Sequence, residues 1–283
     1  MARSAAGLVR VVHPFPSTLD AAAAVAVALI AGAGPSIAVR LGLGMLFLQF
    51  AIGIANDLAD APADALAKPG KPLPAGLLTR RQAGTALCAA GAAGLLSAAS
   101  VGVLALVVGI VGLADGFLYD LRLKGTPLSW VPFAAGVALL PVYGWVGATG
   151  SWPVALWGVV AMAVLAGITL ALANALADLE TDRRSGVRSV ASALGRDRTL
   201  ALEAALMLAV QTIALATSLT LGLDHRTLAF SLSGVCLGWL GVGLASTGRE
   251  RARQAGWEVQ AVGFVLLGAG WLSALSSAGS LGP

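Results

Sequence analysis

A short polar segment interrupts the apolar chain with carboxylates at regular spacing. Asn56, Asp60 and Asp64 follow one another at intervals of four residues, and Lys68 and Lys71 come shortly after them. Residues four apart lie on one face of an α-helix, so Asn56 and Asp60 can point to the same place. The order, with acids first and lysines second, differs from the mixed charges of an ordinary solvated loop.

A second segment repeats this pattern later in the chain. Asn174, Asp178 and Asp182 have the same spacing and also come at the end of an apolar run. Asn174 and Asp178 share a helix face by the same argument. Three basic residues then continue into the expected loop: Arg183, Arg184 and Arg188.

These residue types suit a metal-bound polyphosphate. Mg²⁺ prefers oxygen ligands and is usually held by one or two carboxylates together with substrate phosphates. Asp60 with Asp64 can hold one such ion, and Asp178 with Asp182 another. The remaining phosphate oxygens need cationic donors, and the candidates are Lys68, Lys71, Arg122, Lys124 and Arg188. A diphosphate head with a long apolar tail, as in a prenyl diphosphate, fits such a site at a membrane surface.

The composition places these segments in a membrane protein. The 283 residues are 58% hydrophobic and 11% charged, whereas a soluble domain carries about 25% charged residues. A transmembrane helix needs about 20 apolar residues, and helices satisfy their own backbone hydrogen bonds in lipid. We therefore predict an all-α membrane protein with nine transmembrane helices around a central cavity, at 19–38, 41–58, 82–99, 101–119, 128–148, 152–176, 199–221, 227–247 and 257–279.

The distribution of basic residues predicts the orientation. With nine spans, 16 of the 18 Lys and Arg residues fall on one side, and Arg40 and Arg226 fall on the other. By the positive-inside rule the rich side, with the N-terminus, is cytoplasmic. The basic balance thus reflects topology and not nucleic-acid binding. We expect a multi-pass protein of a bacterial cell membrane, with active-site loops at about 57–81, 119–127 and 177–198.

Prolines and isolated charges predict local breaks. Pro14 and Pro16 favour an interfacial lead-in over residues 1–18, before the first span. Pro62 makes a regular helix beyond Asp60 unfavourable, so Asp64 is expected in a loop. The basic run 249–254 is expected in a loop that meets anionic lipid. Gly234 and Gly238 fit a close-packed helix face.

A third polar group lies between the two aspartate segments. Asp115 is an ionisable residue inside a predicted span, where such residues usually face the bundle interior. It is four residues before Tyr119, so the two share a face. Arg122 and Lys124 follow in the next loop. Asp115 is our candidate for the base that deprotonates an acceptor, and the alternative is a helix-end residue reaching the cytoplasm.

The chain resembles the UbiA superfamily of intramembrane prenyltransferases. Its first motif, N-D-x-x-D-x-x-x-D followed by a basic proline-rich segment, matches Asn56–Asp64 and the sequence KPGKPLPAG at 68–76. Its second motif, D-x-x-x-D-x-x-x-G-x-x-T/S, matches Asp178, Asp182, Gly186 and Ser189. The loop that the family has between the motifs is similar to Tyr119–Lys124. The resemblance covers essentially the whole chain, 1–283, as a single domain.

The resemblance implies a Mg²⁺-dependent transfer. In that family the aspartate motifs bind Mg²⁺ and a prenyl diphosphate, the diphosphate leaves, and an allylic carbocation alkylates an aromatic or other lipophilic acceptor. Asp60, Asp64, Asp178 and Asp182 would be metal ligands. The diphosphate contacts would come from Asn56, Lys68, Lys71, Tyr119, Arg122, Lys124, Asn174 and Arg188.

Two alternatives use the same residues differently. In a terpene cyclase the carbocation is captured within the prenyl chain and no acceptor is needed. In a transporter or non-catalytic membrane protein the acid clusters would bind ions. A transporter would more often place its carboxylates near the bilayer midplane, whereas both clusters here are expected at one membrane face.

Overall fold

The structure is a computed structural model that describes residues 2–222 and 224–280. Within these residues the chain forms helices and no β-strand, so the predicted all-α class is confirmed. The chain divides into two compact units. The first comprises residues up to Arg122 together with Val142–Gly150, and the second comprises Leu123–Pro141 and the residues from Ser151 onward.

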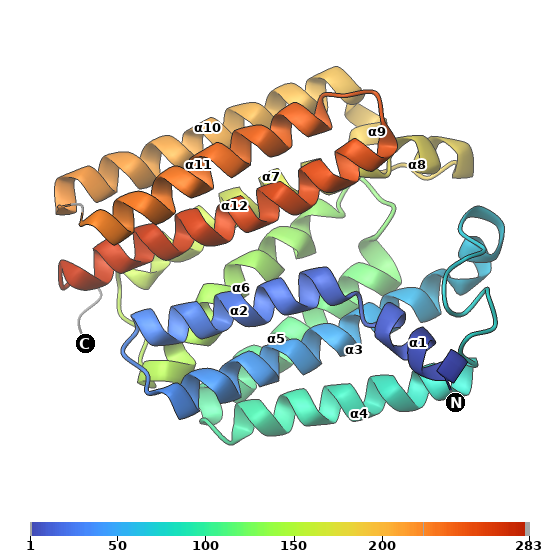
Figure 1. The fold of residues 1–283 in the computed structure, drawn as a ribbon, viewed down its shortest axis with the longest axis horizontal. Helices are drawn as coiled ribbons and strands as arrows, with labels where there is room; N and C mark the ends of the chain where they lie inside the picture. The colour runs from blue at the N-terminus through green and yellow to red at the C-terminus, as the bar shows by residue number, and fades with distance from the viewer. Residues whose placement is uncertain (1, 223, 281–283) are drawn as a thin grey trace. The chain divides into compact units, whose positions relative to one another are not determined.

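The helices follow the chain as Figure 1 labels them. The first five are α1 (Ala2–Val11), α2 (Pro14–Ile30), α3 (Pro35–Ala67), α4 (Arg80–Ala99) and α5 (Val103–Leu118), and a π-helical turn at Tyr119–Leu123 continues α5. The others are α6 (Trp130–Thr149), α7 (Leu156–Ala177), α8 (Leu179–Ser185), α9 (Val190–Leu194), α10 (Arg196–Leu221), α11 (His225–Ala245) and α12 (Glu250–Ser277).

Most of these helices are long and apolar enough to cross a membrane. Among the described residues eight qualify, and the number rises to nine if the bent pair α1 and α2 forms one span. The two helices of that pair meet at 54°. The expected central cavity, the count of nine and the cytoplasmic N-terminus stay predictions. The first expected span, 19–38, is displaced, because α2 ends at Ile30 and Pro35 begins α3.

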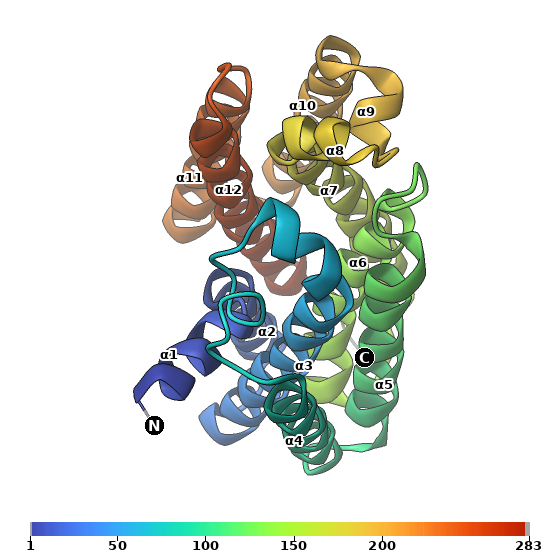
Figure 2. The ribbon, with the colours of Figure 1, turned by 90° about the vertical axis from the view of Figure 1, so that its right-hand side faces the viewer.

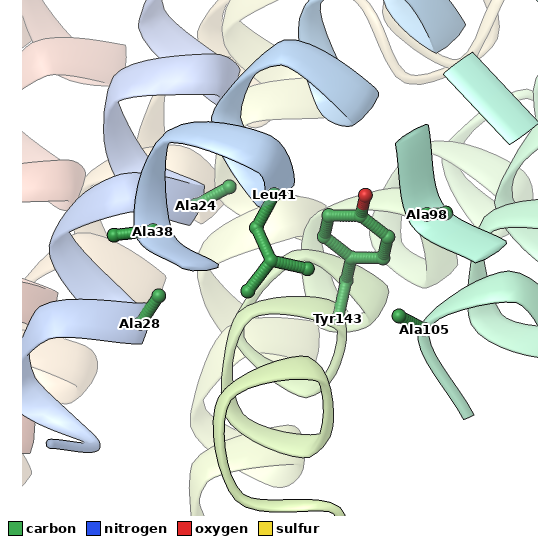
Figure 3. Packing of buried hydrophobic residues seen from close by; sticks show 7 residues of the cluster. All are labelled: Ala24, Ala28, Ala38, Leu41, Ala98, Ala105 and Tyr143. Atoms are coloured by element: carbon green, nitrogen blue, oxygen red, sulfur yellow. The ribbon is translucent and has the colours of Figure 1, made fainter. Parts of the chain in front are cut away.

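The core of the first unit lies where α2 to α6 converge. Leu41 is fully buried and Tyr143 is 1% exposed, and small residues surround both (Figure 3). Gly44 of α3 lies against the Tyr143 ring, where even a Cβ atom would be 2.4 Å from its hydroxyl oxygen. The hydrophobic effect does not drive helices together within lipid. Small residues that allow close packing therefore help to hold such bundles together.

In the second unit α11 and α12 lie side by side at glycine contacts (Figure 1). A Cβ atom on Gly234 would be 2.7 Å from the carbonyl oxygen of Gly263, and one on Gly241 would be 2.6 Å from that of Gly256. Gly238 lies against Met207 and Gln211. The prediction of a close-packed face at Gly234 and Gly238 is confirmed.

Two expectations based on proline are wrong. Helix α3 continues through Pro62 to Ala67, so Asp64 lies in the helix and not in a loop. A proline inside a helix removes one hydrogen bond, but the following turn keeps its own, with the Lys68 N–H 2.8 Å from the Asp64 carbonyl oxygen. The expected break before Pro14 is present, since α1 ends at Val11. The lead-in does not extend to residue 18, however, because Pro14 and Pro16 start α2, where the first turn of a helix needs no N–H donor.

Candidate active site

The first aspartate motif occupies the last three turns of α3. The Asn56 side-chain amide donates a 2.7 Å hydrogen bond to Oδ1 of Asp120, which is 7% exposed. Asp120 follows α5 in the π-helical turn. Single π-helical turns are rare and frequently occur at functional sites. The hydrogen bond therefore joins the first motif to the π-helical turn that begins at Tyr119.

Lys71 closes over the same motif. Its Nζ lies 2.7 Å from Oδ2 of Asp64 and 2.9 Å from Oδ1 of Asp57. Both carboxylates are buried, with side chains 9% and 3% exposed. Partial burial alone would lower the pKa of Lys71, but the hydrogen bonds that its ammonium donates to the carboxylates of Asp64 and Asp57 outweigh burial and raise the pKa above its usual value. The ammonium is therefore charged at neutral pH.

His13 completes this cluster from the N-terminal segment. Its Nε2 lies 3.1 Å from Oδ1 of Asp57. His13 joins α1 to α2 with φ of 49°, and it alone among the described non-glycine residues has a positive φ. Such a backbone conformation is uncommon outside glycine and is kept only where the surroundings hold it. Neither His13 nor Asp57 was predicted from the sequence to be a site residue.

Helix α1 holds the basic loop that follows α3. Arg10 donates a 2.7 Å hydrogen bond to the Gly70 carbonyl oxygen. Val11 and Leu78 pack in one buried cluster with Ile54 of α3. At the far end of the loop, Thr79 caps α4 with a reciprocal capping box. The expected lead-in over residues 1–18 thus contributes contacts that position the loop with Lys68 and Lys71.

The side chains of the third polar group differ in their exposure to solvent. Tyr119 is half-buried at the start of the π-helical turn, and Asp115 is half-buried one turn earlier on α5. Arg122 is exposed and Lys124 is half-buried. Gly125 has φ of +72°, and a Cβ atom there would lie 3.1 Å from Val187. Residues 123–127 therefore pack beside the end of the second motif, within the second unit.

The second motif spans a junction between helices and not a loop (Figure 2). Helix α7 ends at Ala177 and α8 begins at Leu179, with Asp178 between them. The Asp178 N–H lies 3.2 Å from the Asn174 carbonyl oxygen, and the Asp182 N–H lies 2.9 Å from that of Asp178. The hydrogen-bond spacing of four residues thus continues through the motif, although the expected loop from Asp182 onward is wrong.

Residues beyond Asp182 turn the chain back towards α10. Gly186 ends α8 in a left-handed conformation with φ of 69°, which glycine adopts without strain. Ser189 is buried and caps the short helix α9. Leu179 and Ala191 pack with Leu176 in a buried cluster that fixes α8 and α9 on the end of α7. Arg188 stays exposed on this turn.

Arg253 ties this junction to α12. Its Nε donates a 2.9 Å hydrogen bond to the Leu176 carbonyl oxygen, and Nη2 forms an ion pair with Glu180. Arg253 is 1% exposed, so the expectation that the whole run 249–254 meets lipid is wrong for this residue. A cation at the carboxyl end of α7 also complements the helix dipole. Sequence reasoning missed Arg253 because its basic neighbours suggested a surface loop.

The donors at both motifs suit a hard divalent cation. Among residues 2–222 and 224–280, no three Asp, Glu, His or Cys side chains lie together as a ready-made metal site. Mg²⁺ does not require one, because it commonly takes one or two carboxylates and completes its shell with water and phosphate oxygens. Asp60 and Asp64 lie one helical turn apart, as do Asp178 and Asp182. Carboxylate oxygens are the ligands that this ion prefers.

The fold and these motifs define the class of protein. The chain is an all-α, multi-pass integral membrane protein with two aspartate motifs at helix ends. Its residues 19–268 match the model of the UbiA prenyltransferase family, so the chain belongs to that family.

Known proteins support this assignment. The chain is 29% identical over 163 residues to digeranylgeranylglyceryl phosphate synthase of Pyrococcus abyssi, covering 55% of this chain and 58% of the relative. It is 24% identical over 186 residues to 4-hydroxybenzoate octaprenyltransferase of Vibrio atlanticus, covering 65% and 64%. Each match spans less than two thirds of the relative.

A solved structure shares the fold over nearly the whole chain. A UbiA homolog from Archaeoglobus fulgidus, bound to GPP and Mg²⁺, aligns with a TM-score of 0.72 and 16% identity, covering 95% of this chain and 99% of that one. At this level of identity the likeness concerns the arrangement of the helices.

Proposed function

We propose that the protein transfers a prenyl chain from a prenyl diphosphate to a lipophilic or aromatic acceptor, with Mg²⁺ as the cofactor. The observation that carries the proposal is the geometry of the first motif. Asp60 and Asp64 lie one turn apart on α3, and the Lys71 ammonium lies 2.7 Å from Asp64. Carboxylates for a divalent cation and an ammonium for a diphosphate oxygen are therefore in one place.

In this proposal each motif binds one metal ion. Asp60 and Asp64 would hold one Mg²⁺, and Asp178 and Asp182 another. Bound Mg²⁺ would neutralise the diphosphate and stabilise it as a leaving group. The phosphate oxygens not bound to metal would be held by side chains around the motifs: Asn56, Lys68, Lys71, Tyr119, Arg122, Lys124, Asn174 and Arg188.

The surroundings of the first motif keep these groups in place. Asp120 orients the Asn56 amide, and Asp57 with His13 holds Lys71 next to Asp64. A preorganised site does not have to reorganise when charge develops on the leaving group. Asp115, one turn before Tyr119, is the candidate proton acceptor that follows from the sequence.

Relatives indicate the range of acceptors. One is a digeranylgeranylglyceryl phosphate synthase and another a 4-hydroxybenzoate octaprenyltransferase. The second name states its acceptor, 4-hydroxybenzoate, which carries a hydroxyl group. We place the reaction at the cytoplasmic face of the membrane, since the basic residues gather around both motifs.

Diphosphate release tests the proposal. Purified protein would receive GPP and longer prenyl diphosphates, with and without Mg²⁺ and a membrane lipid extract, and products would be identified by mass spectrometry. Release that needs both Mg²⁺ and the extract supports a transferase, and the product mass identifies the acceptor. Release without the extract, with a hydrocarbon or terpene alcohol as product, would show a cyclase. No release and no binding of any prenyl diphosphate would overturn the proposal.

A further inference from the structure

A carboxylate and an amide meet inside the first unit, outside the first aspartate motif. Nε2 of Gln49 on α3 donates a 2.6 Å hydrogen bond to Oδ2 of Asp20 on α2. Helix α3 is one of the eight candidate spans, and α2 belongs to a candidate span only as part of the bent pair with α1. Neither side chain is fully buried by the protein. Neither residue belongs to the motifs that the sequence predicts for binding or catalysis.

The pair lies on the polar side of α3. Gln49 is seven residues before Asn56, which is about two turns and about 10 Å along the helix axis. Residues at spacings of four and seven share one helix face, so Gln49, Asn56 and Asp60 form one line. The partners of α3 on the N-terminal segment have a similar spacing. His13, just before α2, contacts Asp57. Asp20, seven residues after His13, contacts Gln49.

The other sides of α3 have different environments. Val39 and Leu43 are 53% and 44% exposed and mark an apolar outer side. Leu48 and Ile52 pack against glycines of α4 and α5. Gln49 is on neither of these sides by helical spacing. The amide and its carboxylate partner are therefore not directed towards lipid with the exposed apolar residues.

Joining two helices does not require a carboxylate. Hydrogen bonds between polar side chains do stabilise helix pairs in membranes. An ionisable residue within a span is costly, however, and commonly marks a functional position. A neutral pair of amides would join α2 to α3 at lower cost.

A second carboxylate–amide pair in this protein provides the contrast. Gln260 of α12 donates a 2.8 Å hydrogen bond to Glu203 of α10. Both residues are fully buried, at 0% exposure, so no substrate reaches them. The pair at Asp20 has the same chemistry but is partly accessible, and it shares a helix face with the first motif.

We infer that Asp20 and Gln49 form the acceptor subsite, that the acceptor presents a hydroxyl group there, and that Asp20 receives its proton. The inference rests on the proposed function, because it places the acceptor on the apolar side of the diphosphate site. One carboxylate oxygen binds the Gln49 amide, and the carboxylate still offers lone pairs to a hydroxyl donor. A carboxylate or phosphate group of an acceptor would be repelled from this position.

The step balances as an alkylation at oxygen. The bond between C1 of the prenyl chain and the diphosphate oxygen breaks, and its electron pair leaves with the diphosphate. A lone pair of the acceptor oxygen forms the new C–O bond to C1. The hydroxyl proton passes to the Asp20 carboxylate and is later lost to water. The Gln49 hydrogen bond holds that carboxylate in place. The case for Asp115 as the base rests on its position in the sequence alone.

Substitution of Asp20 by Asn tests this inference. Asn retains an oxygen that can accept the hydrogen bond from Gln49, but it cannot take a proton. The D20N protein should unfold at the wild-type temperature and bind GPP with Mg²⁺ within about twofold of wild type. Transfer to an acceptor should fall about 100-fold or more, as expected for loss of a general base. The acceptor would be a glyceryl phosphate that carries one geranylgeranyl chain and a free hydroxyl, because transfer to that hydroxyl forms the C–O bond of this step.

Matched variants exclude a general effect of neutralising a carboxylate. The E203Q protein replaces the carboxyl group of the buried pair by an amide and should transfer at the wild-type rate. If D20N does not fold, Q49M provides the second test, and a drop of about tenfold in transfer with unchanged GPP binding is expected.

Several results would overturn the inference. Transfer at the wild-type rate in D20N, or in Q49M when D20N does not fold, would show that the pair only joins two helices. Loss of transfer in D115N with D20N unaffected would make Asp115 the base. A wild-type protein that neither binds GPP nor releases diphosphate would instead overturn the proposed function, and this inference with it.

Discussion

The Asn56 amide lies 2.7 Å from the buried carboxylate of Asp120, so the first motif is fixed by a residue from the turn after α5. A hydrogen bond to a charged group contributes about 2 kcal/mol. We expect N56L and D120L each to lower the free energy of unfolding in detergent. If the two side chains act through one contact, the double variant should lose about 2 kcal/mol less than the sum of the single losses. Additive losses would contradict the coupling.

The metal assignment predicts a loss of activity without a loss of structure. The substitutions Asp60→Asn and Asp178→Asn should each lower Mg²⁺-dependent diphosphate release by more than about 100-fold, since each removes a metal ligand. Thermal unfolding in detergent should stay near wild type.

Asp197 is the matched control for these variants. It is exposed in the first turn of α10 and belongs to neither motif. The D197N protein should retain full activity. Full activity in D60N or D178N would overturn the assignment of two metal-binding motifs.

The motifs were predictable from the sequence because chemistry fixes their spacing. Two sets of carboxylates four residues apart indicated helix ends with a shared face, and the apolar runs indicated the spans. The long helices formed as expected, with boundaries that differ mainly at prolines. The path through Pro62 was not predictable, because a proline within a helix removes a hydrogen bond and so favours ending the helix, whereas α3 continues to Ala67.

Contacts between residues far apart in the sequence were the main feature of the site that could not be predicted. His13 is 44 residues before Asp57, and Asp120 is 64 residues after Asn56. A single sequence contains no signal that pairs such residues. The positive φ of His13 is likewise a consequence of its surroundings. Asp115 was identified because it is an ionisable residue within a predicted span. The same signal was the one available for Asp20.

Arg253 should be important for stability. It is buried, and its guanidinium binds the Leu176 carbonyl and Glu180 at the second motif. R253M would leave both acceptors without their donor, which costs about 3 kcal/mol. We expect a lower unfolding temperature, and weaker binding of GPP as α8 loses its anchor to α12. R251A changes an exposed neighbour and should stay within about 0.5 kcal/mol of wild type. Equal stability of R253M and R251A would contradict this role.

The start of α11 gives a prediction for the effect of pH. Asp224 caps this helix, with Oδ1 2.7 Å from the Thr227 N–H. Hydrogen bonds from the Thr227 backbone and side chain hold the pKa of Asp224 below its usual value of 3.8. A lowered folded-state pKa means that the ionised cap stabilises the protein fully above the unfolded pKa, and that this stabilisation is lost as pH falls through the folded value.

Two substitutions separate the charge of Asp224 from its capping role. D224A should unfold at a lower temperature than wild type at pH 7, and the difference should shrink below about pH 4. Because Asn is as good a cap as Asp, D224N should stay close to wild type at pH 7, and its advantage over D224A should not change with pH. Thermal unfolding in detergent between pH 7 and pH 3 measures both. A difference between wild type and D224A that is the same at both ends of this range would show that the ionised form contributes nothing.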